Sequence, residues 1–310
     1  MPLAHGTLWI LLSLQRSGTT WFMREMARSP CVRWEAAVFD KFDDKGPEHW
    51  SHKQRRAALE GLKRLADRGE ARFDAPGVSE HLRKWTEHTA ELMSSHNYTR
   101  SPVAVGMKWM GGYGTGGLTM KEARLGKAAH APLTVVDNQG LKNAFDTWLV
   151  PFSKKLKIKF VVLERDALLR RLVSSFHNKA APGEAHTLDP RERAKLAHMR
   201  VELPVGIRLT RELDKERIAL ENLLHLRDKA SAAGLPVRHL TYEELNDDHS
   251  KLDDIREWIL GDQASDPRCA PDHRNTTLKV HVGPVSSHVA NWEAVEETLR
   301  GTRYEHFLSE

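Results

Sequence analysis

Apolar stretches and helical repeats alternate along the chain. Residues 7–14 (TLWILLSL) are almost wholly apolar, which is typical of a strand buried on both faces of a parallel sheet. Three more short apolar stretches predict strands at 103–109, 158–164 and 236–242. Helical spacing of apolar residues follows the first strand at 20–28 and the third at 167–178. Because strand, turn and helix recur, we expect an α/β fold with a parallel central sheet flanked by helices.

Further helices are expected between and after these units, at about 51–68, 77–95, 206–232, 250–260 and 291–300. The one at 206–232 ends at Gly234-Leu235-Pro236, a helix stop signal. No linker interrupts the chain. We therefore predict a single domain over residues 1–310, with helical insertions at about 43–100 and 179–235.

The charge balance favours an anionic small-molecule ligand. The chain has 47 Lys and Arg against 42 Asp and Glu, a formal net charge of +5, without the concentrated basic tracts of a nucleic-acid-binding protein. The apolar stretch from Leu8 to Leu14 is too short to span a bilayer and lacks the features of a signal peptide. We expect neither nucleic-acid binding nor membrane insertion.

Two cysteines, Cys31 and Cys269, are too few to indicate a disulfide framework or a metal site of the C-x-x-C type. The natural inference is a reducing compartment, and we predict a cytoplasmic location. The histidines show no ligand spacing such as H-E-x-x-H, so no metal site is predicted.

The segment 15–21 (QRSGTTW) lies where the first strand turns into a helix, so backbone N–H groups and the positive helix end can converge on an anion. Gly18 allows close approach of the backbone, and Arg16 supplies a permanent charge. Three hydroxyls add donors: Ser17, Thr19 and Thr20. The G-x-x-x-x-G-K-[ST] pattern of nucleoside triphosphate loops is absent. Taken alone, this turn is equally consistent with a simple helix cap.

A second candidate anion site follows the strand at 158–164. Arg165 ends that strand, and Ser174 lies about two turns into the next helix. If both strand ends share one sheet edge, Arg165 and Ser174 can bind a second phosphate beside the first loop. A surface or capping role for Arg165 is the alternative.

Together these motifs resemble a known family. QRSGTTWF at 15–22 and LERDALLRRLVSS at 163–175 are similar to the 5′-phosphosulfate and 3′-phosphate motifs of sulfotransferases that use 3′-phosphoadenosine-5′-phosphosulfate. The spacing from Arg165 to Ser174 is closest to the bacterial nodulation-factor and trehalose branch, which the C-terminal residues 291–304 also resemble. About 43–100 and 179–235 are unmatched.

The resemblance implies a P-loop-like sulfotransferase fold and metal-free sulfuryl transfer to a hydroxyl or amine of a sugar or small metabolite. It also implies a set of donor-binding residues: Arg16, Ser17, Gly18, Thr19, Thr20, Trp21, Arg165, Ser174 and Lys279. Arg16 would in addition stabilise the charge that grows on the bridging oxygen. The product would be 3′,5′-adenosine bisphosphate.

A base must take the acceptor proton, and Glu35 is the first candidate, ahead of Asp40 and His177. A surface carboxylate paired with Arg33 is the alternative for Glu35. Lys108 at the end of the second predicted strand could reach the sulfuryl oxygens, or simply extend into solvent. The glycine cluster 111–117 is assigned to an acceptor-site loop, or to a plain connector.

Two other functions remain open from the sequence. One is a different nucleotide-dependent transferase, such as a kinase or glycosyltransferase, in which the loop holds another phosphate. The other is a binding protein that retains an anion loop without catalysis.

Overall fold

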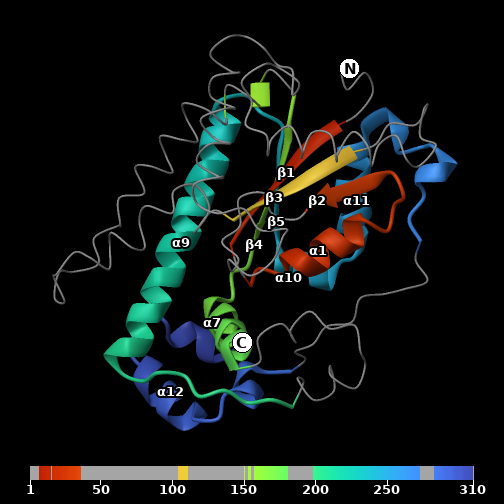
Figure 1. Cartoon of the computed structure of the whole chain (residues 1–310). Helices are drawn as coiled ribbons and strands as arrows, with labels where there is room; N and C mark the ends of the chain where they lie inside the picture. Colours follow the sequence, from red (N-terminus) through yellow and green to blue (C-terminus); the bar gives the residue numbers. More distant parts are fainter. Residues whose placement is uncertain are drawn as a thin grey trace, which may run out of the picture.

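Five parallel strands form the central sheet of the computed structural model, in the order β2-β3-β1-β4-β5 (Figure 1). The structure describes residues 7–14, 16–35, 104–110, 150, 153–154, 157–180, 198–272 and 283–309, and the sheet is made of strands within these ranges. The strands are β1 (Thr7–Ser13), β2 (Val32–Glu35), β3 (Ala104–Met110), β4 (Lys159–Glu164) and β5 (Val237–Thr241). Each neighbouring pair is parallel, which confirms the predicted α/β fold with a parallel central sheet.

Four of the strands follow the predicted apolar stretches closely, whereas β2 is not predicted. Val32–Glu35 is only four residues long and alternates apolar and charged positions, Arg33 and Glu35 being the charged ones. It pairs with β3 alone and so lies at the edge of the sheet. A short edge strand lacks the continuous apolar run by which the interior strands are found.

The helices described by the structure are α1 (Thr19–Met26), α7 (Leu168–Ala180), α9 (Ile207–Ala232), α10 (Tyr242–Asp247), α11 (Ser250–Leu260) and α12 (Trp292–Leu299). Five of them confirm predicted helices. The short α10 is additional and follows β5 directly. The helices expected at 51–68 and 77–95, and the glycine cluster 111–117, lie outside the described residues. None of the described helices is both long and apolar enough to cross a membrane.

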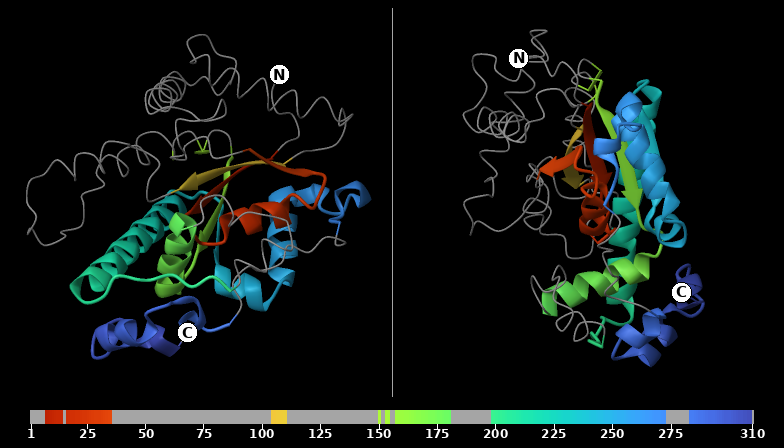
Figure 2. Two further views of the ribbon diagram at one scale, coloured as in Figure 1. Left: turned by 60° about the horizontal axis from the view of Figure 1, so that its bottom comes forward. Right: turned by 90° about the vertical axis from the view of Figure 1, so that its right-hand side faces the viewer.

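Helices cover the sheet on both sides. Figures 1 and 2 show α9 on one side of the strands and α1 with α11 on the other, whereas α7 lies beyond the end of β4. On the α1 side, Trp9 and Leu11 of β1 pack in one buried cluster with Phe22 of α1 and Ile255 of α11. The intervening residues of β1 are also buried, as expected of a parallel strand covered on both faces.

A buried arginine fixes α11 against α1. Arg256 of α11 donates from Nη2 to the backbone carbonyl of Glu25 at 2.9 Å and also pairs with Asp253 in its own helix. A buried charge needs such partners to offset its desolvation. The contact therefore holds α1, and with it the turn that precedes α1, in a defined position.

A second buried cluster lies beyond the sheet, where α7, the first half of α9 and α12 meet (Figure 1). Asp214 of α9 accepts hydrogen bonds from the Tyr304 hydroxyl and the Arg303 guanidinium near the chain end. The later half of α9 instead packs on β4 and β5. The described part of the predicted insertion at 179–235 thus forms a layer over the sheet and a bridge to the C-terminal residues.

The two cysteines form a disulfide, which the sequence alone does not indicate. Cys31, just before β2, bonds to Cys269, which follows α11, across 238 residues of sequence. Both are buried, and the Ser29 hydroxyl donates to the Cys269 carbonyl at 2.7 Å. A pairing of this range cannot be read from cysteine spacing. Because disulfides are typical of oxidising compartments, the cysteine argument for a reducing compartment no longer holds.

We expect Cys31→Ser to lower the free energy of unfolding by about 2–5 kcal/mol, because it frees a long loop of the unfolded chain. Urea unfolding of the oxidised protein and the variant measures the loss. Reductant should destabilise the parent protein similarly and leave a Cys31→Ser/Cys269→Ser double variant unchanged. Two titratable thiols in the denatured, unreduced protein would contradict the pairing.

Candidate functional site

The turn between β1 and α1 has the backbone geometry of an anion-binding loop. Arg16 has a φ of 65° and Gly18 a φ of 72°, so left-handed residues alternate with ordinary ones just before the helix. Gly18 is the N-cap of α1 and offers no side chain to cap it, and the first turn of α1 carries no acidic residue. The N–H groups at this helix start are therefore available to an external anion.

The side chains of this turn add donors and positive charge. Ser17 is fully buried, and its hydroxyl has no hydrogen-bond partner among the described residues. Thr19 is buried and Thr20 partly exposed. Burial lowers the pKa of the Arg16 guanidinium, which still remains charged at neutral pH. An unsatisfied buried hydroxyl beside a partly buried cation fits a site that is completed by an oxyanion.

Tyr242, the first residue of α10, closes this turn from the side of β5. A Cβ atom placed on Gly18 would lie 2.2 Å from Cδ2 of the Tyr242 ring, so only glycine fits between the turn and the ring. Tyr242 also packs edge-on against Trp21 of α1, with ring centroids 5.7 Å apart. Burial raises the pKa of the Tyr242 hydroxyl.

Arg165 joins the turn from the end of β4. Its Nη1 donates to the backbone carbonyl of Arg16 at 3.3 Å, and its guanidinium carbon lies 4.8 Å from the centre of the Tyr242 ring. Its Nε lies 3.6 Å from Oε1 of Glu243 and has no hydrogen-bond partner among the described residues. The structure thus brings Arg16, Gly18, Trp21 and Arg165 to one edge of the sheet.

The backbone places Glu35 and Lys108 at neighbouring positions on adjacent strands. Glu35 ends β2 and pairs with Met107 of β3, the residue before Lys108. Lys108 pairs with Leu11 of β1 and lies two residues before the end of β3, so the prediction that it ends its strand is wrong. Both predicted acceptor-side residues therefore lie in strands on the β3 side of β1, opposite to the side occupied by Arg165.

The remaining candidates are not joined to this cluster. Ser174 lies in the second turn of α7, partly exposed, and no hydrogen bond links it to Arg165. His177 is buried in α7, where its Nε2 lies 3.0 Å from the Met199 carbonyl and its ring packs on His288. Burial, with a smaller effect of His288, lowers the pKa of His177. Lys279 and Asp40 lie outside the described residues.

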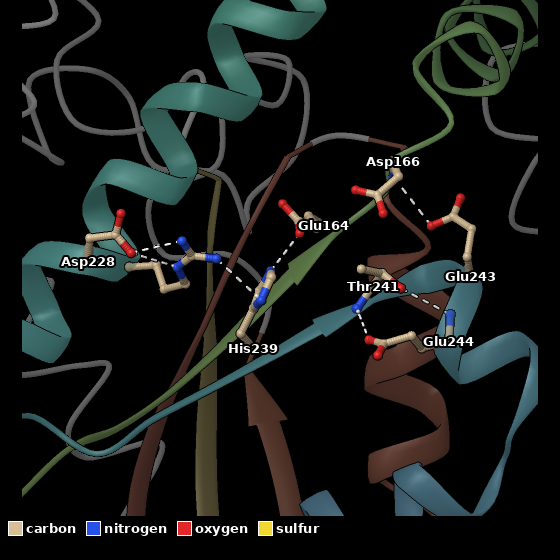
Figure 3. Close-up of polar contacts among 8 residues, drawn as sticks. Glu164, Asp166, Asp228, His239, Thr241, Glu243 and Glu244 are labelled. Atoms are coloured by element: carbon tan, nitrogen blue, oxygen red, sulfur yellow. Dashed lines mark hydrogen bonds and ion pairs between the residues drawn. The ribbon is translucent and has the colours of Figure 1, made fainter. Parts of the chain in front are cut away.

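A chain of charged side chains crosses the sheet face beside the site (Figure 3). Glu164, at the end of β4, accepts from Nε2 of His239 at 2.6 Å, and Arg227 of α9 lies 3.3 Å from Nδ1. Because arginine can only donate, this contact is a hydrogen bond where Nδ1 of His239 is the acceptor. Asp228 pairs with Arg227 at 2.8 Å. These contacts fix the end of β4, from which Arg165 projects.

No group of three or more histidine, cysteine or acidic side chains in the described parts of the chain could hold a metal ion. Comparison with models of known protein families gives no match for this chain, and comparison with curated proteins gives none either. The chemistry of the site therefore has to be argued from its own residues.

Sequence reasoning missed Tyr242 and Glu243 as site residues. Their signal was present, because Tyr242 ends a predicted strand and Glu243 follows it, and residues at the ends of parallel strands gather at the carboxyl edge of the sheet. Thr241 and Glu244 form a capping box that starts α10 at this point. That box turns the chain so that Tyr242 contacts Gly18 and Glu243 approaches Arg165.

We expect Gly18→Ala to destabilise the protein more than Gly234→Ala does. Both glycines have a φ near +70°, where alanine costs about 1–2 kcal/mol, but an added Cβ at Gly234 has nothing within 4 Å. At Gly18 only, the clash of the added Cβ with Tyr242 should increase this cost by about 1–3 kcal/mol. Urea unfolding of the two variants measures the loss in the free energy of unfolding. Equal losses would show that the Tyr242 ring does not pack closely against Gly18.

Proposed function

We propose that the chain is a sulfotransferase with a P-loop-like sulfotransferase fold. It moves the sulfuryl group of 3′-phosphoadenosine-5′-phosphosulfate to a hydroxyl or amine of a sugar or small metabolite. The observation that carries the proposal is the hydrogen bond from Arg165 to the Arg16 carbonyl, which joins the two predicted phosphate motifs in one site.

The strand order supports a nucleotide site at this position. β1 lies between β3 and β4, so the chain leaves β1 toward one side of the sheet and later returns on the other. Ligands of parallel α/β sheets bind outside the carboxyl ends of the strands at such a reversal. The turn at Arg16–Gly18 and the end of β4 both lie there.

The distribution of charge supports a ligand with two separate anionic groups. In the proposed site, the N–H groups of the turn and Arg16 bind the 5′-phosphosulfate, and Arg165 binds the 3′-phosphate. Trp21, which is only partly buried, offers an aromatic side chain on which an adenine can stack. Ser174 and Lys279 are proposed as further donor contacts.

The proposed reaction is an in-line sulfuryl transfer. The acceptor oxygen or nitrogen forms a bond to sulfur while the bond from sulfur to the 5′-phosphate oxygen breaks, and 3′,5′-adenosine bisphosphate leaves. The reaction resembles phosphoryl transfer through a loose transition state, so positioning and charge stabilisation dominate. Glu35 is proposed to take the acceptor proton, and Arg16 and Lys108 to stabilise charge on the leaving and sulfuryl oxygens.

Titration calorimetry with 3′,5′-adenosine bisphosphate tests the donor class. We expect binding without metal, and about tenfold or more weaker binding of ATP, which has no 3′-phosphate for Arg165. Binding of ATP only with Mg²⁺ would instead favour a kinase or a related transferase. Binding of the bisphosphate without turnover of any acceptor would favour a non-catalytic binding protein.

Arg165→Ala tests the second phosphate position. We expect the affinity for 3′,5′-adenosine bisphosphate to fall about ten- to hundredfold, because a charge-assisted hydrogen bond is lost. Affinity for adenosine 5′-monophosphate should change little. The matched control is Arg238→Ala, which removes an arginine of β5 that stacks on Trp258. If Arg165→Ala binds the bisphosphate as tightly as the control, the 3′-phosphate assignment is wrong.

A further inference from the structure

We propose that Glu243 is a carboxylate latch: it occupies the phosphate position on Arg165 when the site is empty, and the incoming 3′-phosphate displaces it. The proposal rests on the proposed function, since it takes Arg165 as the 3′-phosphate ligand. It makes Glu243 a residue that tunes donor and product affinity without contacting the reacting atoms.

The two oxygens of Glu243 face two donors at the end of β4. Oε1 lies 3.6 Å from Nε of Arg165, and Oε2 accepts from the backbone N–H of Asp166 at 3.3 Å (Figure 3). A guanidinium and an adjacent backbone N–H together form a pair of donors suited to an oxyanion. The carboxylate therefore lies where two oxygens of a phosphate could bind.

Both contacts are longer than those of a well-fitted charged pair, for which about 2.7–2.9 Å is usual. Nε of Arg165 consequently has no hydrogen-bond partner among the described residues, although the Arg165 side chain is only 15% exposed. A buried donor left without a partner is costly. A phosphate that made both contacts at normal length would satisfy these donors better than Glu243 does.

Glu243 can leave this position at little cost. Its side chain is 37% exposed, so the carboxylate can turn into water. The next residue, Glu244, is instead held in the capping box by Thr241 and pairs with Lys251 at 3.1 Å. Of the two adjacent glutamates, one therefore starts the helix and the other is free to exchange with a ligand.

The neighbouring acids act on any anion at this position. Burial raises the pKa of Asp166, and the neighbouring carboxylates of Glu164 and Glu243 raise it further. Crowding of like charges at the strand end therefore weakens the binding of Glu243 and of a phosphate alike. With the latch competing for Arg165, 3′,5′-adenosine bisphosphate binds less tightly than the site otherwise allows, which favours its release after transfer.

The test compares Glu243→Gln with Glu244→Gln by calorimetric titration. Both variants remove one negative charge from the same helix, and glutamine can retain the capping box at position 244. Each protein is titrated with 3′,5′-adenosine bisphosphate and, separately, with adenosine 5′-monophosphate, which has no 3′-phosphate. Circular dichroism checks that both variants are folded.

We expect Glu243→Gln to bind the bisphosphate about three- to fivefold more tightly than the parent protein, the range set by a partly exposed ion pair. The affinity of Glu243→Gln for the monophosphate should stay the same. Glu244→Gln should bind both ligands with the affinity of the parent protein. Unchanged or weaker bisphosphate binding by Glu243→Gln, or equal tightening toward both ligands, would overturn the latch while leaving the proposed function standing. Failure of the parent protein to bind the bisphosphate would overturn both.

Discussion

The close contact between Gly18 and the Tyr242 ring is the constraint on which the site depends. It fixes the left-handed turn after β1 against the start of α10, so that the ends of β1, β4 and β5 meet. Arg165 lies against the same ring and bonds to the Arg16 carbonyl. One aromatic side chain thereby positions both arginines of the proposed donor site, although it belongs to neither phosphate motif.

Support for this contact extends outward through the fold. Arg256 of α11 donates a hydrogen bond to the Glu25 carbonyl in α1, the helix that follows the turn. The Cys31–Cys269 disulfide joins the start of β2 to the segment after α11. On the other face of the sheet, His239 and Arg227 hold Glu164 at the end of β4. The turn is therefore held from both faces of the sheet, which suits a site that must present fixed donors to an anion.

Local patterns in the sequence predict the interior strands and the helices that follow them, because burial on both faces leaves continuous apolar runs. They also predict the turn at Arg16–Gly18 and Arg165, since both directly follow such runs. The edge strand β2 escapes prediction because half of its residues are charged. The disulfide, the closure by Tyr242 and the approach of Glu243 to Arg165 escape for another reason: they join residues far apart in the chain, and no spacing rule encodes them. Whether Glu35 acts as the base stays a prediction.

We propose that the turn after β1 and Arg165 bind the two ends of a single nucleotide. A crystal structure of the protein with 3′,5′-adenosine bisphosphate would show where each end binds. We expect the 5′-phosphate on the N–H groups of residues 17–20 and the 3′-phosphate on Arg165, with Glu243 turned away. A nucleotide bound elsewhere, or one whose 3′-phosphate does not contact Arg165, would contradict it.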